Sequence, residues 1–226
     1  KMKKLIAVIP VRKGSQRVKR KNFKLFGKKN LLIYKIEKLK KLKLLDDIVV
    51  NTDSDQAIEI AKKLNVNYFK RDKYFASSKC LNSDFWKNVA DNTKSEYIMF
   101  TNCTSPLIKL STYQKIISIF KKNLLEKKYD SINTVTEIKE FLFHKDKPIN
   151  FIINRTPNSQ DLPNIVKLNF AINILSTKQM SQNKSLIGDK PYLYKLDEIE
   201  GLDINSKFEF SYANYLHKLK FNKPIK

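Results

Sequence analysis

The sequence predicts an α/β fold, with a mostly parallel sheet that carries helices on both faces. Three observations support this prediction. Short apolar runs alternate along the chain with segments whose apolar residues recur at helical spacing, a pattern typical of parallel strands connected by helices. The 226 residues, 42% of them hydrophobic and 11% aromatic, are enough for one large α/β domain with a buried core. No apolar run approaches the roughly 20 residues needed to span a membrane.

The first part of the predicted sheet comes from short apolar runs and the helices between them. Residues 5–9 (LIAVI) form a run that ends at Pro10, which is typical of a buried parallel strand. Leucines and isoleucines then recur at helical spacing, and a later segment begins with acidic residues in its first turn, as the helix dipole favours. We therefore predict further strands at 47–51, 66–69 and 97–101, and helices at 31–45, 53–64 and 83–92.

The second part of the chain departs from this alternation. A helix at 111–125 and a strand at 130–135 continue the pattern. Residues 138–168 then show no clear helix and are rich in apolar side chains, so we expect an irregular or β-rich excursion that carries a partner contact; its members include Phe141, Phe143, His144, Ile149, Phe151, Ile152 and Ile153. A strand at 170–175, an apolar piece at 202–204 and a closing helix at 208–219 complete one predicted domain over residues 1–226.

The charge of the chain is strongly positive. Lys and Arg number 45 against 22 Asp and Glu, which gives a formal net charge of +23. Only five of the basic residues are arginines, whereas readers of phosphates and bases favour the planar guanidinium fork, so nucleic-acid binding is disfavoured. The positive charge can still attract an anionic substrate. Two cysteines, Cys80 and Cys103, do not suggest a disulfide framework, and we expect a cytoplasmic protein with no membrane contact.

The loop after the first predicted strand has the composition of a phosphate-binding loop. Six of the thirteen residues in PVRKGSQRVKRKN (10–22) are basic. Gly14 and Ser15 allow the backbone amides to turn toward an anion, and ligands of open α/β sheets bind outside the carboxyl ends of the strands. The loop matches neither the GxxxxGK[ST] nor the GxGxxG pattern. The alternative interpretation is a solvated basic loop without a ligand.

Three more polar stretches follow predicted strands or lie near the C-terminus. They are NTDSD (51–55), TNCTSPL (101–107) and GLDIN (201–205). Each one alone is more typical of a helix cap or turn than of a binding site. Together they can place polar groups along one rim of the sheet.

The motifs of the chain resemble those of the acylneuraminate cytidylyltransferase family, in the same order along the sequence. IPVRKGSQRVKRKN resembles the family's IPARxGSKxxxxKN loop, and VVNTDSDQAIEIA resembles its VSTDSxxIAxxA segment. TNCTSPL is similar to QPTSPL, SQDLPNIVKLNFAINI to RQDLPxxYxxNGAIYI, and GLDINSKFEF to IDIDTxxDF. The matches run from about residue 5 to residue 215.

This resemblance implies a Rossmann-like nucleotidyltransferase that is homodimeric through the excursion at 138–168. The implied reaction transfers CMP from CTP to a nonulosonic, sialic-acid-like 2-keto sugar acid with release of pyrophosphate, assisted by Mg²⁺. The nucleotide-binding residues that it implies are Pro10, Arg12, Gly14, Ser15, Lys21, Asn22 and Arg71. The implied substrate-binding residues are Asn102, Thr104, Ser105, Gln160, Asp161 and Asn169. Arg12, Lys21 and Asp203 carry the implied catalysis, with Asp203 and Asn205 as metal ligands.

The chain departs from the family pattern at positions near the sugar and the metal. Asn205 stands where the family has a second aspartate, Asn102 where it has glutamine, and Phe170 where it has glycine. These departures leave three alternatives open: another acidic acceptor such as a different 2-keto-3-deoxy acid or a phosphonate, a catalytically weak homologue, or a basic nucleic-acid-binding protein. We interpret Trp86, both histidines and both cysteines as packing residues, and the Lys-rich run 35–43 as a solvated helix face.

Overall fold

The computed structural model of the chain describes residues 5–14 and 17–221. Within these residues a seven-stranded sheet has the strand order β11-β7-β10-β6-β1-β4-β5. Strand β10 is antiparallel to both of its neighbours, and the other six strands run in one direction. The prediction of a mostly parallel sheet is therefore confirmed, with one antiparallel strand near the edge formed by β11 and β7.

The bounds of the elements follow the predictions closely. The strands of the sheet are β1 (Leu5–Val11), β4 (Asp47–Thr52), β5 (Asn67–Lys70), β6 (Tyr97–Phe100), β7 (Ser131–Ile138), β10 (Ile165–Ser176) and β11 (Pro191–Lys195). The helices are α1 (Leu31–Lys40), α2 (Asp55–Lys63), α3 (Asn82–Asp91), α4 (Leu110–Glu126), α5 (Thr177–Asn183) and α6 (Lys207–Phe221). Small elements complete the chain: β2 (Leu25–Phe26), β3 (Lys29–Asn30), β8 (Phe143–His144), β9 (Lys147–Pro148) and the 3-10 helices η1 (Lys21–Phe23), η2 (Lys73–Ala76), η3 (Ile153–Arg155) and η4 (Ser159–Asp161).

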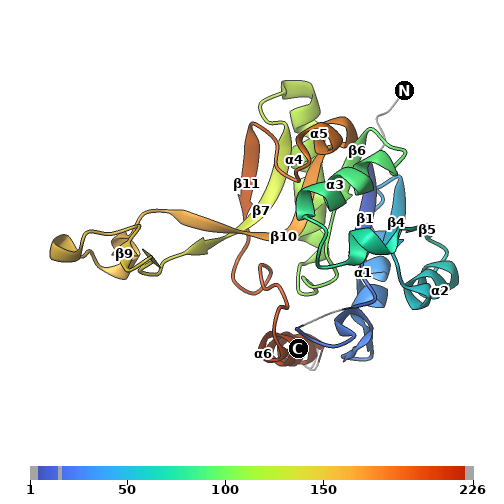
Figure 1. Cartoon of the computed structure of the whole chain (residues 1–226), viewed down its shortest axis with the longest axis horizontal. Helices are drawn as coiled ribbons and strands as arrows, with labels where there is room; N and C mark the ends of the chain where they lie inside the picture. The colour runs from blue at the N-terminus through green and yellow to red at the C-terminus, as the bar shows by residue number, and fades with distance from the viewer. Residues whose placement is uncertain (1–4, 15–16, 222–226) are drawn as a thin grey trace, which may run out of the picture.

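Strand β1 shows why the sheet is covered on both faces. Its residues Ala7 and Ile9 belong to a core cluster with α1, α2, α4 and α6, while Ile6 and Val8 belong to a second cluster with α3 and α5. Successive side chains of a strand point to opposite faces, so an uninterrupted apolar run requires two apolar layers. Figure 1 shows the sheet between these helices, with α3 and α5 together on one side.

The structure differs from the predicted elements in three places. Strand β1 continues through Pro10 to Val11, because β6 pairs with it only as far as Val8 and the missing amide of Pro10 lies beyond that ladder. Helix α5 and strand β11 are absent from the prediction. The first predicted helix ends at Lys40 rather than at residue 45, because the chain turns back toward β4 through Leu42.

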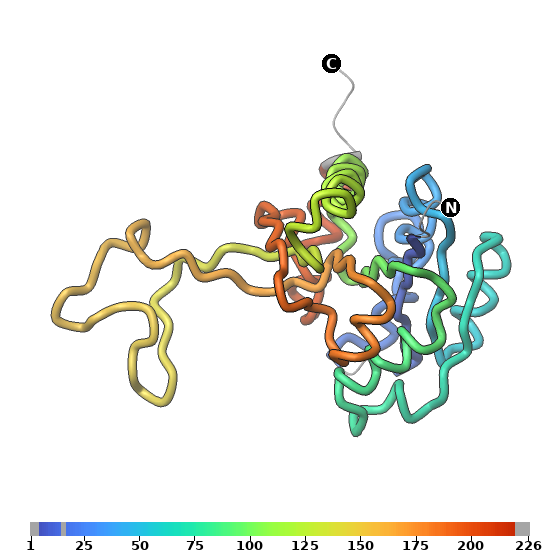
Figure 2. Tube along the Cα trace, turned by 90° about the horizontal axis from the view of Figure 1, so that it is seen from above, coloured from blue at the N-terminus to red at the C-terminus, as the bar shows by residue number. Residues whose placement is uncertain are grey.

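The excursion predicted at 138–168 is an arm that projects from the body of the molecule (Figures 1 and 2). Strands β7 and β10 extend out of the sheet as its base, with Ile138 paired to Ile165. Beyond them lie the short hairpin of β8 and β9 and the two 3-10 helices η3 and η4. The first residue and the last four residues of the predicted excursion therefore belong to β7 and β10, in agreement with the prediction of a β-rich segment.

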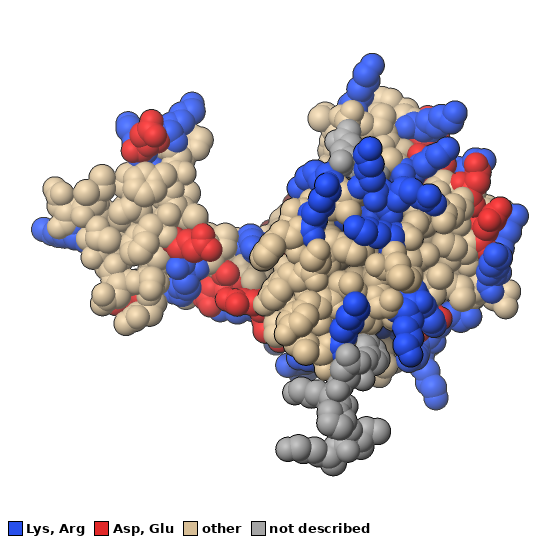
Figure 3. Space-filling view, turned by 90° about the horizontal axis from the view of Figure 1, so that it is seen from below, with Lys and Arg blue, Asp and Glu red and all other residues tan. Residues whose placement is uncertain are grey.

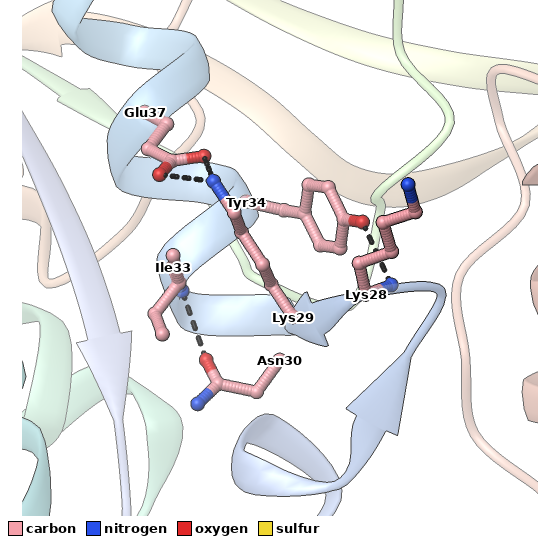
Figure 4. A network of polar contacts seen from close by, with 6 residues as sticks. All are labelled: Lys28, Lys29, Asn30, Ile33, Tyr34 and Glu37. Atoms are coloured by element: carbon pink, nitrogen blue, oxygen red, sulfur yellow. Dashed lines mark hydrogen bonds and ion pairs between the residues drawn. The ribbon is translucent and has the colours of Figure 1, made fainter. Parts of the chain in front are cut away.

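Helix α1 begins at a well-defined cap, which Figure 4 shows. The side chain of Asn30 accepts a hydrogen bond from Ile33 N at 2.9 Å, and the hydroxyl of Tyr34 accepts one from Lys28 N at 3.1 Å. Lys29 and Glu37 form an ion pair at 2.6 Å on the surface, which contributes little to stability. The asparagine cap fixes where the helix starts and so which of its side chains face the core.

Basic side chains gather on one side of the body. Figure 3 views the molecule from the side on which α6 and the loop after β1 lie in Figure 1, and shows Lys and Arg over much of that face. Asp and Glu gather near the base of the arm and at the far edge of the body. Among the described helices, none has both the length and the apolar composition needed to cross a membrane.

Candidate active site

A cavity of about 580 Å³ opens where the loop after β1 meets the ends of several other elements. It lies at the edge of the sheet where ligands bind in open α/β folds. The elements that contribute are far apart in the sequence, from the opening loop to the segment before α6. Its lining comprises Pro10, Arg12, Arg17, Val18, Lys21, Asn22, Arg71, Phe75, Ala76, Ser77, Cys80, Asn82, Phe85, Trp86, Phe100, Asn102, Cys103, Thr104, Leu168, Phe170, Asp203 and Asn205.

One wall of the cavity is cationic. Arg12, Arg17 and Lys21 line it from the opening loop. Lys21 lies in the 3-10 helix η1, and its ammonium group donates a hydrogen bond to the backbone oxygen of Ile204. The pKa of Lys21 is lowered, mainly because the ammonium group is partly buried. The carboxylate of Asp203 raises this pKa, whereas the positive charges of Arg17 and Arg12 lower it. Such a wall of closely spaced cations is suited to a polyanion.

Asp203, Asn205 and Arg17 form a chain of hydrogen bonds along this wall. The guanidinium of Arg17 donates to Asn205 Oδ1 at 2.8 Å, and Asn205 Nδ2 donates to Asp203 Oδ2 at 2.8 Å. The other carboxylate oxygen, Asp203 Oδ1, is buried and has no hydrogen-bond partner among residues 5–14 and 17–221. A buried carboxylate oxygen without a partner is uncommon and calls for a cation or donor supplied by a ligand.

The donor set at Asp203 fits a magnesium ion shared with a phosphate group. Mg²⁺ is commonly bound by one or two carboxylates together with phosphate oxygens and water. Asp203 Oδ1 is available for such a contact, whereas the oxygen of Asn205 is engaged by Arg17. Across residues 5–14 and 17–221, no group of three or more His, Cys, Asp or Glu could hold a metal by itself. A magnesium ion bound here would take one carboxylate oxygen from the described residues and the rest of its coordination from substrate and water.

Arg71 forms the cavity wall on the β4 and β5 side. It is 5% exposed, and its guanidinium donates to Val11 O at 3.1 Å and to Asn51 Oδ1 at 3.3 Å. The guanidinium lies over the ring of Phe85, 4.6 Å from its centroid. Its Nε is buried, and no described residue hydrogen-bonds to it. Burial lowers the pKa of Arg71 to about 10. A ligand that accepts a hydrogen bond here would satisfy this donor.

The turn after β6 contributes polar groups on the opposite side of β1. Asn102, Cys103 and Thr104 line the cavity, and Thr104 O accepts a hydrogen bond from Ile204 N at 2.9 Å. This bond joins the turn to the segment that carries Asp203. Burial raises the pKa of Cys103 to about 12, so its thiol is a poor nucleophile. The interpretation of Cys103 as a small buried residue agrees with its 1% exposure.

The remaining wall is apolar, and of its residues only Phe170 is predicted from the sequence to lie near the site. Phe85 and Trp86 reach it from α3, Phe100 from β6, and Leu168 and Phe170 from β10. The rings of Trp86 and Phe170 lie 6.2 Å apart between centroids, at 32° to one another. Both residues also pack on the second core cluster, which agrees with the interpretation of Trp86 as a packing residue. Phe170 lies at the cavity, as its departure from the family pattern near the sugar indicates.

Several predicted site residues lie outside this cavity. Asn169 is buried by its own hydrogen bonds to Thr134 and Thr136, and Ser105 is fully buried behind the turn. Gln160 and Asp161 are exposed on the arm, in η4, away from the body of the same chain (Figure 1). Gly14 lines a neighbouring hollow beside Arg71, and Ser15 lies outside the described residues.

The other predicted residues do come together. Those that line the cavity are Pro10, Arg12, Lys21, Asn22, Arg71, Asn102, Thr104, Asp203 and Asn205. Arg17 completes the cationic wall and was recognisable in the sequence only as one of six basic residues in the loop. The residues of α3 that line the cavity carry no motif, since their positions depend on how α3 packs across the sheet.

The prediction of a solvated Lys-rich face on the first helix is wrong for Lys35. This side chain is 3% exposed, because it lies on the same helical stripe as the buried residues Leu31, Ile36 and Leu39. Its ammonium group contacts Thr101, Ser105 and Tyr113 behind the turn that follows β6.

Comparisons with known proteins place these observations in context. A family model described as "Cytidylyltransferase" matches residues 6–154, more than half of the chain. The chain is 25% identical to the CMP-N,N'-diacetyllegionaminic acid synthase of Campylobacter jejuni, over 99% of each chain. It is also 25% identical to the N-acylneuraminate cytidylyltransferase of Escherichia coli, over 98% of this chain and 54% of that protein. Among solved structures, a CMP:2-keto-3-deoxy-manno-octonic acid synthetase complexed with CTP shares the fold, with a TM-score of 0.68 and 11% identity over 96% of this chain and 99% of that one.

Proposed function

Because this chain belongs to the cytidylyltransferase family and is a CTP-dependent enzyme, we propose that it transfers CMP from CTP to a nonulosonic acid and releases pyrophosphate. One structural observation indicates that the substrates bind in this cavity. Three residues that line it hold buried polar atoms to which no residue in the described part of the chain hydrogen-bonds: Asn22 Oδ1, Arg71 Nε and Asp203 Oδ1. Buried polar atoms are nearly always hydrogen-bonded, so these three are suited to contacts that a bound substrate supplies.

The cationic wall is the proposed site of the triphosphate. Phosphoryl transfer depends on positioning and charge stabilisation more than on covalent participation by the protein. Arg12 and Lys21 neutralise the phosphate oxygens in this proposal, and Arg17 extends the wall toward Asn205. Asp203 lines the same cavity, and no described residue hydrogen-bonds to its Oδ1. A magnesium ion bound there with the phosphates would supply further charge neutralisation for the departing pyrophosphate.

The two ends of the cavity are suited to different halves of the reaction. Arg71, with its unpartnered Nε and its contact with Phe85, lies at the β4 and β5 end and offers a hydrogen-bond donor to a nucleobase oxygen or ring nitrogen. Asn102 and Phe170 lie across β1, at the β6 and β10 end. We therefore place cytosine at the Arg71 end and the acceptor at the Phe170 end, with the α-phosphate between them.

The chemical class of the acceptor in this proposal is inferred from the names of the relatives. The two curated relatives described above are named for legionaminic and neuraminic acid, both nonulosonic acids. These acceptors carry a carboxylate, which the positive charge of the cavity attracts. The hydroxyl oxygen at the anomeric carbon attacks the α-phosphate, the bond from that phosphorus to the pyrophosphate oxygen breaks, and the hydroxyl proton leaves to solvent or a nearby base. This reaction requires CTP, so we place the enzyme in the cytoplasm.

The arm is the proposed dimer contact. Large apolar side chains on it are exposed in the single chain: Phe141, Phe143, Ile149, Ile152 and Ile153. Exposed apolar groups concentrated on one projecting segment are typical of a protein interface. Gln160 and Asp161 lie on the same arm and are remote from the cavity of their own chain. In a homodimer they would be able to reach the acceptor end of the partner's cavity.

Thermal unfolding with nucleotides tests the nucleotide half of this proposal. A ligand present at a hundredfold excess over its dissociation constant stabilises the folded state by about 2.7 kcal/mol. We expect CTP with Mg²⁺ to raise the melting temperature, and ATP, GTP and UTP to raise it much less. Arg12→Ala removes a cation of the cavity and should abolish the CTP shift. Arg20→Ala is the matched control in the same loop, because Arg20 bonds to Gln56 and does not line the cavity.

Pyrophosphate release with a panel of acidic sugars tests the acceptor half. Turnover of nonulosonic acids, lost in Arg12→Ala and retained in Arg20→Ala, is the expected result. A CTP-selective shift without turnover of any nonulosonic acid would contradict the acceptor class but not the nucleotide. The absence of any nucleotide shift, together with salt-sensitive binding to DNA or RNA, would instead support a basic binding protein.

A further inference from the structure

Phe170 has an unusual backbone conformation for a bulky residue. Its φ angle is 54°, in the left-handed region that glycine tolerates and large side chains rarely adopt. It lies in a bulge of β10, where the pairing with β7 passes from Leu168 opposite Val135 directly to Asn173 opposite Asn133. Residues 169–172 of β10, four in number, therefore lie opposite a single residue of β7, Thr134. Strained conformations of this kind persist only where the surrounding structure imposes them, and they cluster at functional sites.

Buried hydrogen bonds impose this conformation. Thr134 Oγ1 donates to Asn169 Oδ1 at 2.7 Å and accepts from Ile172 N at 3.0 Å. Asn169 Oδ1 also accepts from Ala171 N at 3.2 Å, and Asn169 Nδ2 donates to Thr136 Oγ1 at 2.9 Å. Thr134 and Asn169 thus replace the ladder bonds that the bulge lacks, on both sides of Phe170. The network fixes the direction in which Phe170 leaves the strand.

The bulge carries the ring of Phe170 to Trp86. The ring centroids are 6.2 Å apart with an angle of 32° between the planes, and both residues line the cavity. Leu168 lines the cavity from the same strand. Trp86 and Phe170 are only partly buried, although they pack on the core beneath them. They therefore present a broad apolar surface to whatever occupies the β10 end of the cavity.

The acceptor end, as assigned in the proposed function, coincides with this surface. A hydroxyl group pressed against the two rings would lose its hydrogen bonds to water without gaining a partner. A methyl group or an aliphatic carbon would instead be removed from water favourably. The surface thus distinguishes between sugar acids that have the same carboxylate and anomeric carbon but differ in their other substituents.

We propose that Phe170 and Trp86 are the specificity-determining residues of the acceptor site. They select 2-keto sugar acids that turn a methyl group toward the rings, either the methyl of an N-acyl group or a deoxygenated carbon, over acids with free hydroxyls at the same positions. The proposal rests on the proposed function and deepens it, because it assigns a substituent pattern to the acceptor.

Matched acceptors and three variants test the proposal. One acceptor pair differs by an acetamido group against a hydroxyl at C5 of the nonulosonic acid, and the other by a methyl against a hydroxymethyl group at C9. Phe170→Gly suits the positive φ and removes the ring, and Trp86→Leu keeps apolar volume without the ring. The control is Phe208→Ala, an aromatic residue that is 76% exposed on α6 and does not line the cavity.

The expected result is a difference in acceptor preference without a difference in CTP binding. In the wild type, kcat/KM for the more apolar member of at least one pair should exceed that of the other by about tenfold or more. In Phe170→Gly and Trp86→Leu this ratio should fall to within about threefold. The change should come mainly from the KM of the apolar acceptor, and the CTP-induced rise in melting temperature should remain. Phe208→Ala should keep both the ratio and the shift.

The outcomes separate this inference from the function on which it rests. If the wild type prefers the hydroxylated acceptors, or if both aromatic variants keep the wild-type ratio, the inference is overturned while the cytidylyltransferase assignment stands. If CTP stabilises the protein but neither acceptor pair is turned over, the proposed acceptor class fails and this inference fails with it. If Phe170→Gly loses the CTP-induced rise in melting temperature, Phe170 does not act on the acceptor alone, and its role as a specificity-determining residue is overturned. The acceptor preference of Trp86→Leu then decides the role of Trp86.

Discussion

The ammonium group of Lys35 lies 3.1 Å from the hydroxyl oxygen of Thr101, inside the protein and next to the turn that carries Asn102 and Thr104. Its other acceptors are also uncharged: Tyr113 OH at 2.5 Å and Ser105 O at 3.4 Å. Among the described residues, no carboxylate pairs with it within 4.0 Å. Burial lowers the pKa of Lys35 to about 8, with Cys103 and Asp203 acting weakly in the opposite direction.

The first prediction concerns the pH dependence of the free energy of unfolding. Lys35 has a pKa of about 8 when folded and an ordinary value of 10.5 when unfolded. Below pH 8 it is protonated in both states, and the folded state bears the full cost of the buried charge. Between pH 8 and 10.5 the unfolded state binds more protons, so this residue's contribution to stability improves as the pH rises, by about 3 kcal/mol over the interval.

Urea unfolding of the wild type and Lys35→Met at pH 7, 8, 9 and 10 measures this contribution. The stability of the wild type relative to the variant should rise with pH above 8. The thiol pKa of Cys103 is raised to about 12 and that of Tyr113 is raised as well, so neither neighbour titrates in this window. Lys40→Met is the control, since Lys40 is exposed on the same helix. If the free energies of unfolding of the wild type and Lys35→Met change equally with pH, the lowered pKa of Lys35 is contradicted.

The second prediction concerns Asn205. Its amide joins Arg17 to Asp203, with both hydrogen bonds at 2.8 Å. In Asn205→Asp a second carboxylate faces Asp203, and repulsion between the two favours a bound cation. We expect the apparent dissociation constant of Mg²⁺, measured by thermal shift in the presence of CTP, to fall by about tenfold. Asn205→Ala, which removes the amide oxygen and adds no charge, should not tighten Mg²⁺ binding. Equal Mg²⁺ affinity in the wild type and Asn205→Asp would rule out a metal near Asp203.

The order of strands and helices could be predicted from local patterns because each element has a clear periodicity. Strand β11 (PYLYK) was missed because it begins with proline and is only partly buried, although Tyr192 and Tyr194 alternate with exposed neighbours. Helix α5 was missed because it has seven residues and one buried side chain, Met180; its serine cap, Ser176, was the available signal. Lys35 was misplaced for a different reason. A lysine is expected to be exposed, but its position four residues from Leu31 and from Leu39 places it on the buried face of α1.

The polar part of the candidate site could be predicted because its residues lie in loops next to strand ends. The hydrogen bond from Ile204 N to Thr104 O joins two of the predicted polar stretches, and the bond from Lys13 N to Asp53 Oδ1 joins two others. The resemblance to the family indicates that Phe170 lies near the sugar, but the contact between Phe170 and Trp86 could not be predicted. Trp86 and Phe170 are 84 residues apart in the sequence, and they meet only because a bulge in β10 redirects one of them.

The third prediction tests whether Asn169 is a structural residue. Its side chain makes three buried hydrogen bonds, and Asn169→Ala leaves Ala171 N and the hydroxyls of Thr134 and Thr136 with fewer partners. The free energy of unfolding should fall by about 1–3 kcal/mol. Asn158→Ala is the matched control, since Asn158 is exposed on the arm and makes one long hydrogen bond to Asp161. Equal urea midpoints for the wild type and Asn169→Ala would contradict the role of this network.

The last prediction concerns the arm. Phe151 contacts Phe141 and Phe143 edge to face, with centroids 5.0 and 5.3 Å apart. Ile152 and Ile153 on the same arm are more than 60% exposed. The aromatic contacts shape the arm, and the isoleucines remain for a second copy to cover. We expect sedimentation to show a dimer for the wild type. Ile153→Asp would place a charge in that interface and should weaken self-association by at least about tenfold, because an unpaired charge is costly to bury.

A substitution elsewhere on the surface separates this effect from a general one. Leu125 is 85% exposed near the end of α4, so Leu125→Asp adds the same charge outside the arm and should leave the dimer intact. If Gln160 and Asp161 act across the interface, Ile153→Asp should also raise the KM for the acceptor while the CTP shift stays unchanged. A wild-type monomer at micromolar concentration with full activity would exclude both the dimer and the contribution of the arm to a neighbouring site. A dimer that survives Ile153→Asp would place the interface on another surface.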